Sequence, residues 1–345
     1  MKRYSLSCEI LSPLHIGTGD ELDPLNYIIK GETMYRISFD RLVGRMDDAE
    51  RTALEALIDE GNLLKLRRFV VRHPQVLREP VCSVAVTPSL AKLYSTKLDD
   101  IQNQLLIHPF MRTQGGAIPF IPGSSLKGAI RTAVVSELAK GGSLPKPGGT
   151  REEYEFEARV LDSDDAKNDP FRGLKIRDAA LSDSDMIVAE VRNLKRKGSS
   201  VETNSIQMMC EITRSRVSGN AVTFETELLL DDGLHAVGFI KKPLSAEQVV
   251  MSCNNFYREK METEHKKFYR GSRMDGASAA LLGVALEPGE FLLRMGRFSG
   301  VESVTLDGYR NPKPPGKRGI WGTTRNIADD AFPMGWMKVR LVEIA

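Results

Sequence analysis

The 345 residues are enough for about two domains of ordinary size. Hydrophobic residues make up 41% and charged residues 27%, and no apolar run approaches the roughly 20 residues that cross a bilayer. The composition therefore indicates a soluble protein, while the formal net charge of +2 excludes the strong basic excess of a protein that captures nucleic acid unaided.

The N-terminus reads as a strand with charged residues and not as a signal peptide, so we expect a cytoplasmic protein that makes no contact with membranes. The four cysteines, Cys8, Cys82, Cys210 and Cys253, lie far apart and form no C-x-x-C pair. This spacing predicts reduced, buried thiols and suggests neither a disulfide framework nor a structural zinc site. We expect no cofactor and no bound metal.

The first third of the chain alternates between strand and helix patterns. Apolar and polar residues alternate over 2–11, as in a half-buried strand. Residues 14–20 form a glycine-broken turn that leads into a second extended stretch at 27–29, and residues 34–38 are expected to pair with that stretch. Helices are predicted at 48–60 and 62–73, and strands at 104–112 and 117–121, joined by Gly115 and Gly116. This order predicts an α+β sandwich with one sheet face covered.

The stretch from Ile121 to Arg131 carries the strongest functional signal. Ser124 and Ser125 follow the Pro122-Gly123 turn where a helix begins, so at least one hydroxyl is expected to act as N-cap. Lys127 and Arg131, four residues apart, share one face of that helix. Hydroxyls, free N–H groups and two cations would then converge on a phosphate. An ordinary capped helix with solvated basic residues is the alternative.

Two other ligand motifs are excluded. Gly123 and Gly128 have the spacing of a nucleotide-binding loop, but Ala129 and Ile130 stand where Lys and Ser/Thr are required. The acidic loop at 162–167 resembles a calcium loop, yet Ala166 and Lys167 occupy the positions of an oxygen ligand and of the turn glycine.

Residues 141–149 are rich in glycine and proline, and we place a domain boundary there, with domains at 1–140 and 151–345 and a linker at 141–150. The second part is predicted to contain a helix at 151–161 and strands near 173–178, 205–216 and 221–230. A long helix at 245–268 and a glycine-rich C-terminal third follow.

A strand at 290–295 runs into Gly296-Arg297-Phe298-Ser299-Gly300. Such a glycine loop lets backbone N–H groups approach a phosphate, while Arg297 could pair with the RNA backbone and Phe298 could stack on a base. A bulged turn with Phe298 in the core is the alternative. A second glycine-rich loop holds Trp321 and Arg325, and 336–344 is predicted to be the closing strand.

Local basic patches on a near-neutral chain suit a subunit that shares RNA with partners, although each could be plain solvated surface. They are Lys65, Arg68 and Arg72; Arg192, Lys195, Arg196 and Lys197; and Arg310, Lys313, Lys317 and Arg318.

Taken together, the sequence resembles the RAMP superfamily of CRISPR-associated proteins, and within it the family of the fifth-named subunit of the type III-A Csm effector complex. The resemblance is carried by residues 11–19, by 121–128, by Asp169-Pro170-Phe171 leading to Asp178, and by 296–300. These motifs are spread over nearly the whole chain and follow the family's order.

The resemblance implies two RRM-like, ferredoxin-like domains with antiparallel sheets, inserted helices and glycine-rich loops. It implies a non-catalytic subunit that binds crRNA, caps the end carrying its 3′ part and supports its maturation in antiviral defence. The implied partners are crRNA, the neighbouring backbone RAMP subunits, the small helical subunit and, indirectly, target RNA. The RNA-binding residues would be His15, Gly17, Gly19, Gly123, Ser124, Ser125, Lys127, Arg131, Gly296, Arg297, Phe298, Ser299 and Gly300.

Two alternatives to this function stay open. An endoribonuclease, which slices target RNA or processes the crRNA precursor, could use His15 as general base with Asp20, Glu21 or Asp23. The other histidines, His73, His108, His235 and His265, are isolated in the sequence. A protein scaffold that contacts no RNA is the second alternative.

Overall fold

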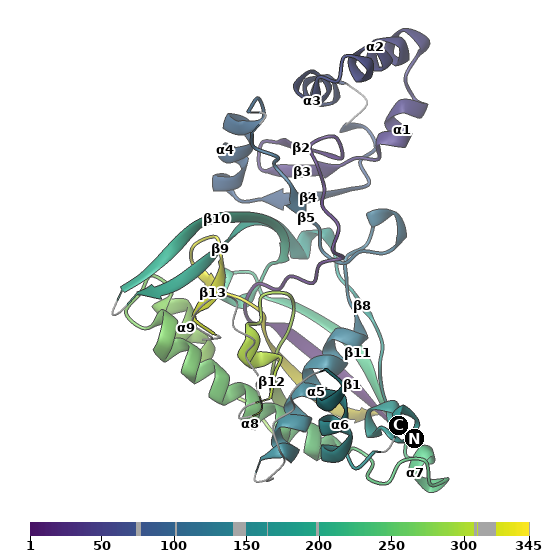
Figure 1. Cartoon of the computed structure of the whole chain (residues 1–345), viewed down its shortest axis with the longest axis vertical. Coiled ribbons are helices and arrows are strands. Elements are labelled where there is room, and N and C mark those ends of the chain that lie inside the picture. The colour runs from purple at the N-terminus through teal and green to yellow at the C-terminus, as the bar shows by residue number, and fades with distance from the viewer. Residues whose placement is uncertain are drawn as a thin grey trace.

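The computed structural model describes residues 1–73, 77–100, 102–140, 150–163, 165–197, 200–306, 309 and 322–344. The molecule is elongated, with an upper lobe built from early elements of the chain and a larger lower lobe at which both termini meet (Figure 1). The predicted boundary at 141–149 and the residues Arg310, Lys313, Lys317, Arg318 and Trp321 lie outside the described residues.

An antiparallel five-stranded sheet organises the lower lobe, in the order β12-β15-β1-β11-β7. Its strands are β1 (Lys2–Ile10), β7 (Leu174–Ile176), β11 (Val222–Leu230), β12 (Glu290–Arg294) and β15 (Trp336–Ile344). The alternation predicted for residues 2–11 is confirmed, because Tyr4, Leu6, Cys8 and Ile10 are all buried. The predictions at 221–230, 290–295 and 336–344 are confirmed as well.

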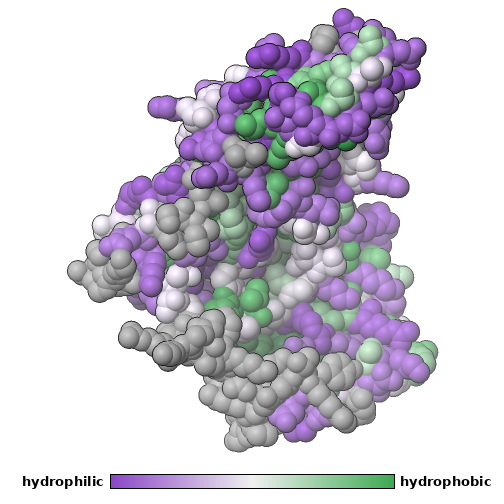
Figure 2. All heavy atoms as spheres, turned by 45° about the horizontal axis from the view of Figure 1, so that its top comes forward, coloured by the Kyte–Doolittle hydropathy of each residue, from purple (hydrophilic) through white to green (hydrophobic). Residues whose placement is uncertain are grey.

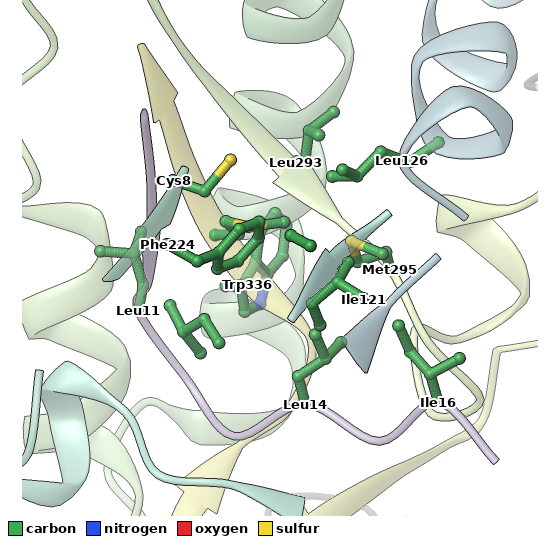
Figure 3. Packing of buried hydrophobic residues seen from close by; sticks show 14 of the residues in the cluster. Cys8, Leu11, Leu14, Ile16, Ile121, Leu126, Phe224, Leu293, Met295 and Trp336 are labelled. Atoms are coloured by element: carbon green, nitrogen blue, oxygen red, sulfur yellow. The ribbon is translucent and has the colours of Figure 1, made fainter. Parts of the chain in front are cut away.

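Two helices, α5 (Gly123–Ala139) and α8 (Ala246–Glu264), pack against each other and cover one face of this sheet. Figure 3 shows Leu126 of α5 beside Leu293 of β12, in the same core as Trp336 and Phe224. The opposite face is polar, since Ser7 lies between Arg340 on β15 and Glu225 on β11. One sheet face is therefore covered, as predicted.

A second, mixed sheet joins the two lobes in the order β14-β13-β9-β4-β3-β2, and β10 pairs with β9 and β5. Its strands are β2 (Tyr27–Lys30), β3 (Thr33–Arg36), β4 (Cys82–Val86), β5 (Ile107–His108), β9 (Met186–Lys197), β10 (Ser200–Thr213), β13 (Thr324–Ala328) and β14 (Phe332–Pro333). The expectation of purely antiparallel sheets is wrong here, because β4 runs parallel to β9 and β5 runs parallel to β10.

The upper lobe has a small core of its own beneath three helices, α1 (Phe39–Gly44), α2 (Asp48–Asp59) and α3 (Leu63–Arg72). Asp47 and Glu50 form a capping box at the start of α2, and Asn62 caps α3. Figure 2 shows a stripe of apolar surface among the hydrophilic residues of this lobe. Helix α4 (Pro88–Lys97) follows β4.

The hairpin predicted from 104–112 and 117–121 is only partly formed. The two arms meet through a bridge between Arg112 and Pro119, but the regular strands within them are two residues long and pair elsewhere. Strand β5 joins the second sheet, and β6 (Phe120–Ile121) pairs with β8 (Ala179–Ala180). The turn glycines were recognised correctly, whereas these non-local pairings have no signal in the local sequence.

Besides short 3-10 turns, the remaining helical segments of the described residues are α6 (Thr150–Val160), α7 (Gly233–Ala236), a π-helical turn (His265–Tyr269) that continues α8, and α9 (Asp275–Leu282). None of the helices in the described ranges is long and apolar enough to span a bilayer.

Strands from both sides of the predicted boundary occur in both sheets. Strand β1 lies between β15 and β11, and β4 lies beside β9. Segments far apart in the sequence therefore meet between the sheets, and the candidate site forms at such a meeting point.

Candidate nucleic-acid interface

A cavity of about 580 Å³ lies where three of the predicted segments meet, and we call it the glycine cavity. It is lined by residues from the N-terminal turn, from α5 and from the loop after β12. Six of the predicted RNA-binding residues contribute to it: Gly17, Gly19, Ser125, Gly296, Arg297 and Ser299. The structure thus brings together segments that are more than a hundred residues apart in the sequence.

The N-terminal turn is anchored by the core below it. Leu14 and Ile16 point into the same cluster as Ile121 and Met295 (Figure 3). The Ile16 carbonyl accepts a hydrogen bond from the N–H of Met111, with 2.7 Å between nitrogen and oxygen. Gly17 and Gly19 are therefore presented at the surface by flanking residues that are fixed in the interior.

The loop after β12 is pressed against this turn. Gly296 has φ +92°, and a Cβ there would lie 2.5 Å from the carbonyl oxygen of His15. A positive φ and so close an approach both require glycine. The Ser299 hydroxyl closes the loop by donating to the Gly296 carbonyl, at an O–O distance of 2.6 Å.

One face of α5 forms a wall of the glycine cavity. Ser125, Gly128, Ala129 and Thr132 line it at the spacing of a single helical stripe. Their side chains are small, and a Cβ at Gly128 would meet no atom within 4 Å. This wall lets a ligand backbone come close to the helix.

The start of α5 differs from the prediction. Pro122 is the N-cap and makes no side-chain capping bond, so Ser124 and Ser125 lie within the first turn and cap nothing. The N–H of Gly123 donates to a carboxylate oxygen of Asp178, 2.7 Å away. A Cβ at Gly123 would also overlap the carbonyl oxygen of Ile176. The positive end of this helix is therefore already occupied by the chain's own carboxylate.

Lys127 and Arg131 do not converge with the hydroxyls on one spot as predicted. A helix turns by ~100° per residue, which places Lys127 ~200° from Ser125, away from the cavity wall. The guanidinium of Arg131 is bound by Glu157 and Asp169 and lies 5.0 Å from the Phe171 ring centroid. Burial lowers the pKa of Lys127.

His15 and Phe298 lie beneath the cavity and not in its lining. Their rings stack with centroids 5.5 Å apart, and both side chains are buried, which confirms the alternative in which Phe298 belongs to the core. The side chain of Phe298 is thus not available to stack on a base. The His15 Nδ1 hydrogen-bonds the Glu211 carbonyl at 2.8 Å. Burial lowers the pKa of His15 to about 4.

Arg297 supplies positive charge at the mouth of the glycine cavity. Its side chain is exposed, and no carboxylate among the described residues pairs with it. The guanidinium carbon lies 5.7 Å from the Phe298 ring centroid, and Nη1 lies 3.5 Å from Nδ1 of His108. Arg294 also lines the cavity, but it is buried and bound by Glu264. Arg297 is therefore the cation best placed to meet an anion there.

The catalytic set considered above is not assembled. Asp23 accepts hydrogen bonds from the backbone N–H of Leu25 and the side chain of Asn26, while a carboxylate oxygen of Glu21 lies 3.8 Å from His108. The Nε2 of His15 faces Gly17, where a Cβ would lie 2.8 Å from it. In the part of the chain that the structure describes, no three His, Cys, Asp or Glu side chains gather in a way that could hold a metal ion.

Several lining residues were missed by the sequence reasoning. The stripe of small residues that contains Gly128 and Thr132 is visible in the sequence at helical spacing, and could have been recognised as a helix face without bulky side chains. His108 was treated as isolated, because it reaches the site through the pairing of β5 with β10, which joins residues a hundred positions apart.

Comparison with known proteins gives three findings. The model of the RAMP superfamily matches residues 7–248. A curated protein of Methanocaldococcus jannaschii, "CRISPR system Cms protein Csm5", is 27% identical over 134 residues, which is 38% of this chain and 30% of that protein. A protein of the same name from Mycobacterium tuberculosis is 23% identical over 236 residues, 57% of this chain and 60% of the relative. The matches thus span less than two thirds of either relative.

Two solved structures share the fold. A chain in the cryo-EM structure of a Csm-crRNA-target RNA ternary complex of a type III-A CRISPR-Cas system is similar with a TM-score of 0.65 and 21% identity, over 99% of this chain and 100% of that chain. The crystal structure of T. onnurineus Csm5 is similar with a TM-score of 0.62 and 20% identity, over 96% and 99%.

Proposed function

The chain belongs to the RAMP superfamily, and from that premise we propose that it is a non-catalytic, RNA-binding subunit of a type III-A CRISPR effector complex. It binds crRNA, caps the end of the complex that carries the 3′ part of this RNA, and supports crRNA maturation. Its partners are the crRNA, the neighbouring backbone RAMP subunits, the small helical subunit and, indirectly, target RNA. The Csm5 names of two curated relatives support this assignment.

The observation that carries the proposal is the glycine cavity with Arg297 at its mouth. Three chain segments approach one another through glycines and small side chains, so a ribose-phosphate chain can lie close to the protein backbone. An arginine without a carboxylate partner among the described residues is available to pair with a phosphate. RNA-binding groups in our proposal are therefore Gly17, Gly19, Ser125, Gly296, Arg297 and Ser299.

The two sheets support an RRM-like architecture, and we include this in the proposal. Each sheet with its helices would be one RRM-like unit, with the chain passing between the units more than once. Many RRM units bind bases through aromatic rings on the open sheet face. The outward residues of β15, β1 and β11 include Arg340, Ser7 and Glu225, and none of the outward positions at which β15 and β11 pair with β1 is aromatic. This favours the glycine cavity over the sheet face as the RNA site.

The geometry favours binding over cleavage. A general base must reach the proton that it removes. His15 is 1% exposed, and its Nδ1 is engaged by a backbone carbonyl. Of the three acidic side chains that were considered with it, Asp23 accepts hydrogen bonds within a turn and Glu21 lies beside His108. Binding without hydrolysis is therefore the function that we propose.

The full chain and a labelled guide-length RNA would test the function directly. Photocrosslinking followed by peptide mapping is expected to yield RNA adducts on the segments that contain Gly17, Ser125 and Arg297, and the RNA is expected to stay intact with or without magnesium. Adducts confined to other surfaces would contradict the site, and an absence of RNA adducts in the assembled complex would favour a scaffold. Cleavage abolished by His15→Ala or Asp20→Ala would establish an enzyme.

A further inference from the structure

A second cavity of about 520 Å³ adjoins the glycine cavity, and we call it the amide cavity. Glu21 and His108 line both cavities, so the two adjoin at these residues, and we call the pair of cavities the groove. The far wall of the amide cavity is formed by residues 102–106, which follow α4, and by Met208 of β10. Its volume lies within the range of about 300–1,000 Å³ that is usual for ligand pockets.

The wall formed by residues 102–106 is held rigidly from the interior. Arg67 of α3 is 3% exposed and donates to the carbonyls of Asn103 and Gln104, at 3.3 and 3.2 Å. The hydroxyl of Tyr27 donates to the carbonyl of Leu105 at 2.6 Å. Leu105 has φ +53°, an unfavourable left-handed conformation that such anchoring can maintain. The backbone is thus bound to the core, and neighbouring polar side chains line the groove.

The lining of the amide cavity differs in charge from that of the glycine cavity. It contains no lysine or arginine among the described residues, whereas Arg297 lines the glycine cavity. Of its two carboxylates, Glu21 lines both cavities and Asp100 lines the amide cavity alone. Burial and the nearby Arg297 lower the pKa of His108 and so disfavour its cationic form, although Glu21 acts in the opposite direction. A phosphate would therefore be disfavoured in the amide cavity, although it is favoured in the adjoining glycine cavity.

The remaining groups suit a nucleobase. Gln102 and Gln104 are exposed, and their side-chain amides make no hydrogen bond to the described residues. Leu106 and Met208 supply apolar contacts to which a ring can pack. The glutamine amides can both donate and accept hydrogen bonds, whereas the carboxylates only accept them. The lining therefore offers more acceptors than donors, which favours the exocyclic amino groups of bases, and uracil lacks such a group. Single-stranded RNA is commonly read by such splayed bases.

We propose that the amide cavity binds one unpaired base with an exocyclic amino group, namely adenine, cytosine or guanine, of the RNA strand whose phosphate lies at Arg297. This inference rests on the proposed function and adds a base preference to it. A peptide arm of a neighbouring subunit is the competing occupant, and it would leave no preference among RNAs.

Anisotropy titrations of the full chain with short labelled oligoadenylate, oligocytidylate and oligouridylate would test this. We expect the better of the two amino-bearing RNAs to bind about tenfold more tightly than oligouridylate. The double variant Gln102→Ala/Gln104→Ala should bind all three with the wild-type affinity for oligouridylate. Gln114→Ala, an exposed glutamine outside both cavities, should retain the wild-type preference and serves as the control.

The outcomes separate this inference from the proposed function. Equal wild-type affinity for the three RNAs, tighter binding of oligouridylate, or an unchanged preference in the double variant would overturn the base site and leave RNA binding in place. A uniform loss for all three RNAs in the double variant would also overturn it, because base reading must be selective. Failure of the wild-type chain to bind any of the RNAs would instead contradict the proposed function.

Discussion

The backbone N–H of Arg297 donates to the carbonyl oxygen of His15, with 2.9 Å between nitrogen and oxygen. This bond ties the loop after β12 to the N-terminal turn, while Phe298 stacks beneath on the His15 ring. The exposed guanidinium is therefore carried by a backbone that is anchored on both sides. A phosphate-binding cation gains affinity from such anchoring, because the backbone loses little conformational freedom when the ligand binds.

Replacing Gly296 should disturb this anchoring. Gly296→Ala forces a side chain into φ +92° and against the His15 carbonyl, so we expect the free energy of unfolding to fall by about 1–3 kcal/mol. Gly128→Ala is the matched control, because its Cβ meets no atom within 4 Å and the position is helical. That variant should be more stable by about 0.5–1 kcal/mol. Urea unfolding of both would measure this, and equal stabilities would contradict the packing described.

Lowering the pH should lower the free energy of unfolding, because His15 is buried in its neutral form. Its pKa is about 4 in the folded chain, against roughly 6.5 when unfolded. Between these values the unfolded chain takes up a proton that the folded chain does not, so stability falls as pH drops from about 6.5 toward 4. This group contributes at most about 1.4 kcal/mol per pH unit to the slope of the free energy of unfolding against pH.

The variant His15→Gln has no titratable group at this position, so its free energy of unfolding against pH is the control for the contribution of His15. Unfolding measured at several pH values should show a wild-type chain that loses stability faster than the variant between about pH 6.5 and 4. Parallel pH profiles of the two proteins would show that His15 is protonated as readily in the folded chain as in the unfolded one.

A buried ion-pair network supports the floor of the glycine cavity. Glu264 is 2% exposed and binds both Arg294 and Arg325. Glu264→Gln would leave the buried Arg294 without a carboxylate and Arg325 with Glu302 alone, and we expect it to lower the free energy of unfolding by about 3–5 kcal/mol. Glu262→Gln, an exposed residue on the same helix, should change stability by less than about 0.5 kcal/mol. Similar denaturation midpoints for the two variants would argue against the network.

The two cations of α5, the ion-paired Arg131 and the half-buried Lys127, should not act as phosphate ligands. Arg131→Ala breaks half-exposed ion pairs with Glu157 and Asp169 and should cost up to about 1 kcal/mol of stability. Neither it nor Lys127→Ala should change the salt dependence of RNA binding. A flatter dependence in either variant would show that the RNA also follows the outer face of α5.

The sequence predicted the regular elements well where their signal is local. The alternation of β1, the helices α2 and α3, and the closing strand β15 all depend on neighbours in the chain, and all are confirmed. The α+β class and membership of the RAMP superfamily are also confirmed. The order of the strands in the sheets could not be predicted from the sequence, because pairs such as β1 with β15 or β4 with β9 are decided by packing between distant segments.

The candidate site could be predicted only in part for the same reason. The glycine motifs around Gly17 and Gly296 identified two walls of the cavity. The neutralisation of the α5 N-terminus by Asp178 could not be foreseen, since that carboxylate lies 55 positions away. Phe298 offered two interpretations from its neighbours, and only the stacking against His15 decides between them.

The salt dependence of RNA binding by Arg297→Ala tests the central claim most directly. Each phosphate contact to single-stranded RNA contributes about 0.7 to the slope of log affinity against log salt concentration, because bound counter-ions are released. Relative to the wild-type chain and to Arg41→Ala, an exposed arginine of the upper lobe, Arg297→Ala should bind guide-length RNA more weakly and with a slope shallower by about 0.7. An affinity and a slope that both match those of the wild-type chain would contradict a phosphate contact at the glycine cavity.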